Sequence, residues 1–309
     1  MKYSSHIDFF RAVLIALVIL VHVVHLGDLY PTFKSGVLAF IMPAFLVVTG
    51  YLVNINKGVK DFALYLFRIL LPYCVMVSGF AFLSLYLPVH DGLEEPSISA
   101  LTHVLLVKSI GPYWFLHTMT VCAILYYAAF RLPKRLNDTA KFSLFASLLI
   151  LVALFTPLLK IESGAYYFIG VGIRLYLKDF SKAYTASLWP LLPFALLISQ
   201  STFYHWSLLW VLACVLCFFC FSARLCSFLS DRTLSMVSYV GKNTFPIYIL
   251  HPIFTMLAKF YLPLFHFDPS GILHALFTLF LALIGSLSIA KAMDYTHLSY
   301  LLGRKRMLR

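Results

Sequence analysis

Long apolar runs separated by short polar segments repeat along the whole chain. A run of about 20 apolar residues spans the hydrocarbon core of a bilayer as an α-helix. Ten such runs lie near residues 8–26, 36–53, 69–87, 112–130, 142–159, 164–178, 186–202, 206–223, 243–259 and 273–291. The pattern predicts an all-α membrane protein, a bundle of about ten transmembrane helices. The sixth run is the shortest and carries Gly170 and Gly172, so its limits stay open.

The composition supports a membrane protein and excludes an ordinary soluble domain. Of 309 residues, 61% are hydrophobic and 12% are charged, whereas soluble domains carry about 25% charged residues. The excess of apolar residues over that of a soluble domain is distributed along the full length of the chain. We therefore predict one polytopic membrane domain, residues 1–309, without an appended soluble domain.

The net charge of +12 is explained by membrane topology. If the N-terminus is cytoplasmic, the outer segments hold only four of the 24 Lys and Arg residues, Lys34, Lys108, Lys160 and Lys259. This bias follows the positive-inside rule and predicts that both termini are cytoplasmic. The charge therefore gives no support for a nucleic-acid partner. Short loops and a first span without a cleavage pattern fit a multi-pass protein of a bacterial inner membrane. The longest outer segment, 88–111, is expected to hold a re-entrant or interfacial helix over residues 98–108.

Two polar residues stand out in the first span. Arg11 and His22 are separated by ten apolar residues, so they lie about 20° apart around a continuous helix and about 16 Å apart along it. Polar groups on one face of a membrane helix point to a lined interior and a function. For Arg11, the alternative is a side chain that snorkels to the interface. For His22, the alternative is a structural role as a single buried histidine whose hydrogen bonds are made within the protein.

Other spans carry polar residues with a structural and a functional interpretation. Tyr248 and His251 are three residues apart and so neighbours on one helix, and His117 lies within the fourth span. Both histidines could simply form interhelical hydrogen bonds. Asn243 and Thr244 could cap the ninth span.

An aromatic residue and a group of cysteines have similarly simple explanations. Trp114 sits where an interfacial aromatic belt is expected, although its ring could also stack on a sugar. Cys214, Cys217 and Cys220 have the spacing of cluster ligands, but they lie in an uninterrupted apolar helix with no turn to wrap a metal. We predict no metal site.

Six segments, in order, are similar to the acyltransferase-3 family of integral membrane O-acyltransferases. They are Arg11-x10-His22, IMPAFLVVTGYL with Met42, Pro43 and Gly50, FRILLPY with Arg68 and Pro72, PYWFLHTM with Trp114 and Phe115, YYFIG with Gly170, and GKNTFPIYILHP from Gly241 to Pro252. One departure is Tyr65, which stands where the family often has a second arginine before Arg68. Arg68 would then act alone or with Lys57 or Lys60.

The resemblance implies an activity. Family members are thought to move an acyl group, usually acetyl, from cytoplasmic acyl-CoA to a hydroxyl of an extracytoplasmic or lipid-linked glycan. The expected donor is therefore acyl-CoA, most simply acetyl-CoA, and no metal is required. The residues expected to bind this polyanion are Arg11, Arg68, Lys57 and Lys60, because guanidinium and ammonium groups suit phosphate. Arg11 and His22 are the catalytic candidates, and His22 would act either as general base or as transient acyl carrier. Trp114, His117, Tyr248 and His251 are candidates for substrate binding.

Two other functions use the same features. A transporter or flippase for a lipid-linked sugar could use the buried polar residues as a pathway, and a nonenzymatic partner in a glycan-assembly complex needs no chemistry. The basic cluster at the inner ends of the first and third spans favours an enzyme, because a flippase has no need for a CoA site. The acceptor, the acyl chain length and the oligomeric state stay open.

Overall fold

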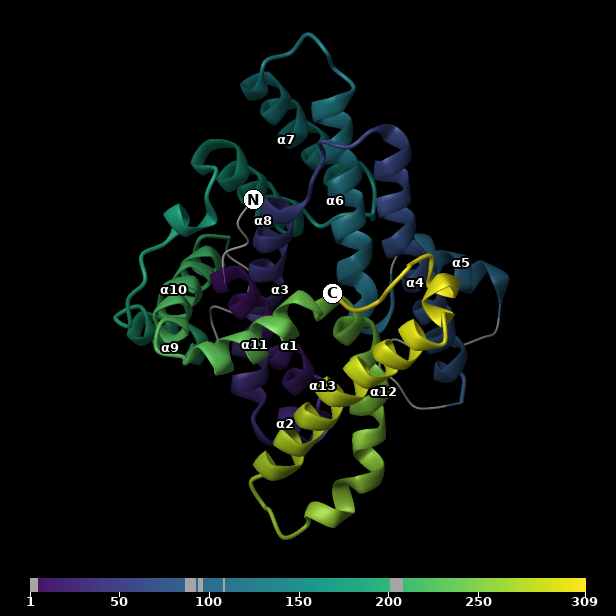
Figure 1. The fold of residues 1–309 in the computed structure, drawn as a ribbon, viewed down its shortest axis with the longest axis vertical. Coiled ribbons are helices and arrows are strands. Elements are labelled where there is room, and N and C mark those ends of the chain that lie inside the picture. Colours follow the sequence, from purple (N-terminus) through teal and green to yellow (C-terminus); the bar gives the residue numbers. More distant parts are fainter. Residues whose placement is uncertain (1–4, 87–92, 94–96, 108, 201–207) are drawn as a thin grey trace. The chain divides into compact units, whose positions relative to one another are not determined.

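The structure is a computed structural model that describes residues 5–86, 93, 97–107, 109–200 and 208–309. In this part of the chain every regular element is helical (Figure 1). The α-helices are α1 Ser5–Val21, α2 Val24–Leu29, α3 Pro31–Leu52, α4 Val59–Ser84, α5 Ile98–Leu106, α6 Trp114–Arg131, α7 Asp138–Phe155, α8 Ile161–Gly172, α9 Leu191–Ser199, α10 Leu208–Cys226, α11 Asp231–Lys242, α12 Thr244–Tyr261 and α13 Ile272–Tyr295. Lys108, which enters the predicted charge bias, lies outside the described residues.

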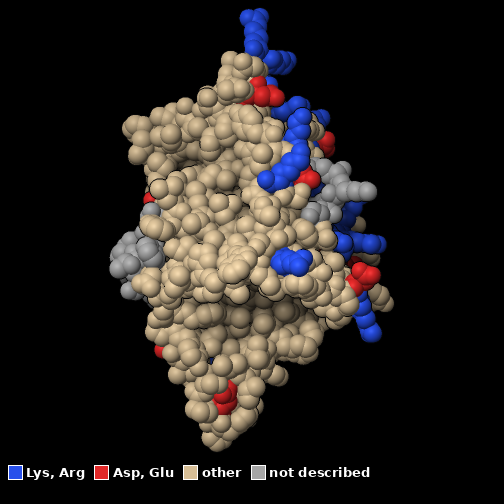
Figure 2. Space-filling model, turned by 90° about the vertical axis from the view of Figure 1, so that its left-hand side faces the viewer, with Lys and Arg blue, Asp and Glu red and all other residues tan. Residues whose placement is uncertain are grey.

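Seven of the ten predicted spans are confirmed as helices long and apolar enough to cross a membrane. They correspond to α3, α4, α6, α7, α10, α12 and α13. Much of the surface drawn in Figure 2 carries neither Lys or Arg nor Asp or Glu. Several of these helices expose large apolar side chains, such as Leu154 and Phe155 of α7. Such surfaces suit contact with lipid. A total of ten spans and the cytoplasmic position of both termini stay predictions.

The first predicted span is wrong as a continuous helix. α1 ends at Val21, and the shorter α2 begins at Val24. At the break the backbone tightens, because the His22 N–H donates to the Ile19 carbonyl at 3.1 Å instead of continuing the α-helical pattern. His22 therefore lies at a helix end.

The seventh predicted span is also shorter than expected, whereas the sixth, near residues 164–178, is covered almost entirely by α8 and the turn that continues it. α8 ends at Gly172 and continues as one π-helical turn, Ile173–Leu177. α9 is a helix of nine residues that starts after Pro190. Proline has no N–H and disfavours a helical conformation at the residue before it, so the helix does not extend backward.

The start of α4 and the helix α11 were not predicted from the hydropathy pattern. The third span was predicted from residue 69, but α4 starts at Val59, so that Arg68 lies well inside the helix. Hydropathy finds the apolar part of a helix and misses its polar first turns. α11, in a predicted cytoplasmic segment, was not foreseen as a helix, whereas the helix expected over 98–108 is confirmed as α5.

The chain folds into two compact units that are interleaved in sequence. The first comprises Met1–Phe45, Leu177–Ser299 and Lys305–Arg309, and the second comprises Leu46–Tyr176 and Tyr300–Arg304. The prediction of one membrane domain is not tested by this division.

α1 is the central helix of the first unit. It contacts α10, α11, α12 and α13, and Figure 1 shows it beside α11 and α13. Its large apolar residues are buried, among them Phe10, Leu14 and Ile15. The crossing with α11 is very close, because a Cβ added at Gly241 would overlap the backbone of Asp8. Only glycine fits there.

The second unit is built around α6. This helix packs on α4, α7 and α8, and its buried Tyr126 contacts Phe145 of α7 with a ring distance of 5.3 Å. The start of α4 is joined to this core by stacked rings of Phe62 and Tyr127, 3.9 Å apart. These contacts fix the position of α4, which carries Arg68.

Candidate functional site

His22 is oriented by the end of α1. Because the His22 N–H bonds to Ile19, the carbonyl of Val18 is left without its usual helical partner. The imidazole Nδ1 lies 2.6 Å from that carbonyl oxygen. A carbonyl can only accept, so Nδ1 carries the proton and Nε2 of the neutral ring carries the lone pair.

His251 is oriented in the same way by a proline. Pro252 follows it in α12 and has no N–H, so the Tyr248 carbonyl lacks its partner four residues on. His251 Nδ1 donates to this oxygen at 2.8 Å. The side chain is fully buried, and among the described residues its Nε2 has no hydrogen-bond partner. His251 thus also presents a lone pair on Nε2.

The two imidazoles are neighbours. The ring centres of His22 and His251 lie 5.3 Å apart in an edge-to-face arrangement, and the ring of Tyr248 lies 5.9 Å from that of His251. Each ring carries a lone pair on Nε2, and this nitrogen can accept a proton from a hydroxyl group. Either Nε2 can also act as a nucleophile.

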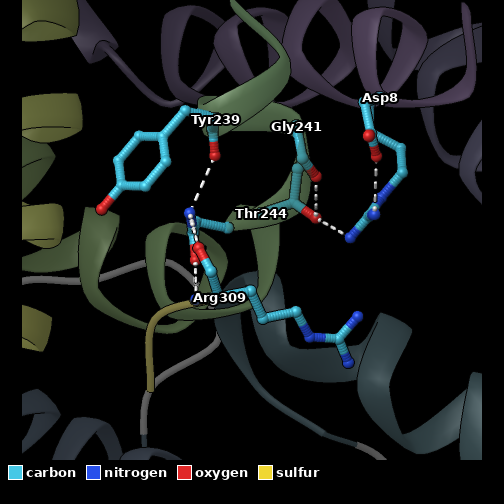
Figure 3. Close-up of polar contacts among 7 residues, drawn as sticks. Asp8, Tyr239, Gly241, Thr244 and Arg309 are labelled. Atoms are coloured by element: carbon cyan, nitrogen blue, oxygen red, sulfur yellow. Dashed lines mark hydrogen bonds and ion pairs between the residues drawn. The ribbon is translucent and has the colours of Figure 1, made fainter. Parts of the chain in front are cut away.

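Arg11 is held in a buried polar network (Figure 3). Its Nη2 donates to the Thr244 hydroxyl at 2.5 Å, and its Nη1 lies 3.6 Å from the Asp8 carboxylate. Asp8 is 2% exposed. Lys242 and Arg309 add to the positive charge that acts on this carboxylate. The guanidinium is therefore engaged inside the first unit, unlike a side chain that snorkels to an interface.

Arg11 and His22 both face α12. Their partners Thr244 and His251 are seven residues apart, which is close to two turns and about 10.5 Å along one helix face. α1 therefore makes two polar contacts with one face of α12. Arg11, which is paired with Asp8, makes one of them, and His22 makes the other with His251.

The side chain of Asn243 does not cap α12. It occupies the N-cap position of α12 without a side-chain capping bond. Its amide instead donates to the Tyr239 carbonyl at 2.9 Å and accepts from the Arg309 N–H at 2.8 Å (Figure 3). Thr244 is the first residue of α12 and accepts from Arg11, so the capping interpretation is wrong for both residues.

The remaining predicted residues belong to the second unit. Lys57 places its Nζ 4.6 Å from the centre of the Tyr65 ring, and Lys60 is exposed in the first turn of α4. His117 Nε2 lies 3.0 Å from the Leu106 carbonyl oxygen, an interhelical hydrogen bond to α5. Trp114 is partly buried and contacts Phe115.

The comparisons with known proteins identify the family. A family model described as an acyltransferase domain matches residues 5–291. The chain belongs to the acyltransferase-3 family. No curated protein and no solved structure gives a significant match. Family membership confirms the resemblance predicted from the six segments, and it supports a multi-pass membrane acyltransferase.

Within this acyltransferase-3 chain, three polar contacts were not predicted from the sequence, those of Asp8, Thr244 and Arg304. Asp8 precedes Arg11 by three residues, a spacing that places both on one helix face and was readable from the sequence. The contact of Thr244 with Arg11 bridges 233 residues and had no local signal. Arg304 donates to the backbone of Arg68 over 236 residues, again without a local signal.

Proposed function

We propose that this protein is a membrane O-acyltransferase of a bacterial inner membrane. It moves an acyl group, most simply acetyl, from cytoplasmic acyl-CoA to a hydroxyl of an extracytoplasmic or lipid-linked glycan. One observation carries the proposal: His22 and His251 lie side by side, each with Nδ1–H bonded to a backbone carbonyl. Both rings thereby keep a lone pair on Nε2, which a general base requires, within a protein of an acyltransferase family.

In the proposed reaction, Nε2 of His22 accepts the proton of the acceptor hydroxyl. The hydroxyl oxygen attacks the thioester carbonyl carbon, the new C–O bond forms and the C–S bond breaks. The proton then passes from the imidazolium to the CoA thiolate, so that the products are the ester and CoA thiol. His251 supports the base from the neighbouring position, where the ring dipole of a neutral imidazole can stabilise the charge on His22.

The cationic residues divide between two tasks. Arg11 is tied to Asp8 and Thr244, so it holds α1 against α12. In the second unit, Arg68, Lys57 and Lys60 provide positive charge for the CoA phosphates. Trp114, His117 and Tyr248 stay candidates for acceptor binding.

The test is acyl transfer by the purified protein in lipid nanodiscs. With radiolabelled acetyl-CoA, we expect wild type to hydrolyse or transfer the acetyl group, and His22→Ala to lose at least about a hundredfold in rate, the size expected for loss of a general base. His25→Ala is the matched control, because it removes a nearby histidine of α2 that lies outside the pair. Thermal unfolding of each variant checks that the fold is intact.

The same assay separates the alternatives. Full activity of a folded His22→Ala protein would contradict the mechanism. A wild-type protein that neither binds nor turns over any acyl-CoA, yet moves a lipid-linked sugar between leaflets, would instead establish the flippase. Mass spectrometry of an acyl–histidine adduct after rapid quenching distinguishes an acyl carrier from a base, because only the carrier forms a covalent intermediate.

A further inference from the structure

The backbone carbonyl of Arg68 can accept a hydrogen bond from outside α4 because of a proline. Pro72 lies four residues further along α4 and has no N–H, so this carbonyl has no partner within the helix. Arg304 Nε donates to it at 3.0 Å. Both arginines belong to the second unit. The chain thus places the guanidinium group of Arg304 against the backbone of α4 at Arg68.

Gly303 makes this approach possible. It adopts a left-handed conformation with φ +68°, and a Cβ at this position would lie 2.8 Å from Cε1 of Phe67 on α4. A larger residue would be strained by its backbone and would push the segment away from α4. The glycine and the proline therefore act together to bring Arg304 to Arg68.

The side chain of Arg68 has an unsatisfied donor. Its Nε is buried and has no hydrogen-bond partner among the described residues. Arg68 lies nine residues after the start of α4, about 13.5 Å along the axis. A buried N–H of a charged group that lacks an acceptor costs free energy, and an anion would supply both the acceptor and the counter-charge.

Other cations lie toward the start of the same helix. Tyr65 and Arg68 are three residues apart and share a face of α4, and the ammonium group of Lys57 lies over the Tyr65 ring. Lys60 is in the first turn. A line of positive charge therefore leads from the start of α4 to Arg68. Phosphate is the anion that such a set of groups recognises best, because guanidinium donors match its oxygens.

We propose that Arg304 and Arg68 together bind a phosphate group of the acyl-CoA donor. This inference rests on the proposed function and adds to it a residue from the far end of the sequence. Arg304 supplies the second guanidinium on α4, while its Nε stays bonded to the Arg68 carbonyl.

The test measures the affinity of full-length protein for CoA in nanodiscs of a zwitterionic lipid. Arg304→Gln keeps an N–H donor for the carbonyl but removes the charge. We expect it to weaken CoA binding about tenfold or more, as for loss of a charge-assisted hydrogen bond, with little change in the unfolding temperature. Arg68→Gln should have a similar effect. Lys305→Gln, which removes an exposed charge one residue further on, should change the affinity by less than about twofold.

Each contrary result has a distinct meaning. If Arg304→Gln binds CoA as tightly as wild type, while Arg68→Gln does not, the inference is overturned and the proposed function stands. If wild type does not bind CoA but retains phosphatidate in an Arg304-dependent manner, the phosphate comes from a lipid headgroup, and both the donor assignment and the proposed function are overturned. If neither phosphate compound binds, the site itself is refuted.

Discussion

Backbone carbonyls without helical partners orient three polar side chains of this protein. His22, His251 and Arg304 each donate to such an oxygen. Pro252 and Pro72 explain two of these free carbonyls, and the end of α1 explains the third. In a membrane an unpaired carbonyl is costly, so the side chain that satisfies it is held firmly. For a histidine, the same bond fixes which ring nitrogen carries the lone pair.

The ion pair of Asp8 and Arg11 gives a prediction at the scale of residues. Asp8→Ala removes the carboxylate beside a guanidinium that is 14% exposed. We expect the free energy of unfolding to fall by roughly 2–3 kcal/mol, somewhat less than for a fully buried pair, because Thr244 still accepts from Arg11. Reversible denaturation in nanodiscs measures the change.

The double variant Asp8→Ala/Arg11→Ala is the control for this pair. The double variant also removes the guanidinium that Asp8→Ala leaves unpaired, so we expect it to be more stable than Asp8→Ala alone. Losses that simply add in the double variant would show that the two charges do not interact in the folded protein.

Prolines within membrane helices set the geometry at the scale of elements. α3, α4 and α12 contain Pro43, Pro72 and Pro252 within the helix. Each removes one backbone hydrogen bond, and two of the three freed carbonyls accept from a polar side chain. The family motifs that contain Pro72 and Pro252 thus also determine where Arg304 and His251 lie.

Pro252→Ala tests whether the proline of α12 orients His251 by freeing the Tyr248 carbonyl. The restored N–H at position 252 would bond to the Tyr248 carbonyl and compete with His251 Nδ1, so the ring would lose part of its orientation. We expect the rate of acyl transfer to fall about tenfold, a shift of about 1.4 kcal/mol in the barrier. The unfolding temperature should stay equal or rise, because alanine favours a helix.

Pro43→Ala in α3 is the matched control for that variant. It also restores a helical N–H, but the freed carbonyl at position 39 takes part in none of the hydrogen bonds described for the candidate site. Its rate should stay within about twofold of wild type. Equal rates in Pro252→Ala and wild type would contradict the role assigned to the Tyr248 carbonyl.

At the scale of the whole molecule, the untested prediction is the direction of the chain across the membrane. The charge bias places both termini in the cytoplasm. A green fluorescent protein fused after Arg309 should therefore fluoresce, and alkaline phosphatase at the same position should be inactive. Fusions after Ser270, in the segment between α12 and α13, should behave in the opposite way. Reversed signals would invert the topology and place Arg11 on the outer side.

The sequence predicts some parts of this protein much better than others. Seven spans, the helix α5 and the family follow from it, because hydropathy and short motifs are local properties of the chain. The break at His22 does not, since AVLIALVILV reads as an uninterrupted helix and only the hydrogen bonds at Ile19 and Val18 show where it ends. The amphipathic α11 was missed because it is too polar to be found by a search for apolar runs.

By itself, then, the sequence determined that this is a multi-pass membrane protein of the acyltransferase-3 family, and it singled out Arg11 and His22. Only the tertiary structure decided which groups these residues contact. Arg11 with Thr244, His22 with His251, and Arg68 with Arg304 are each more than 220 residues apart in the chain. Helix packing brings them together, and packing depends on the shape of whole helix faces. No local pattern encodes that information.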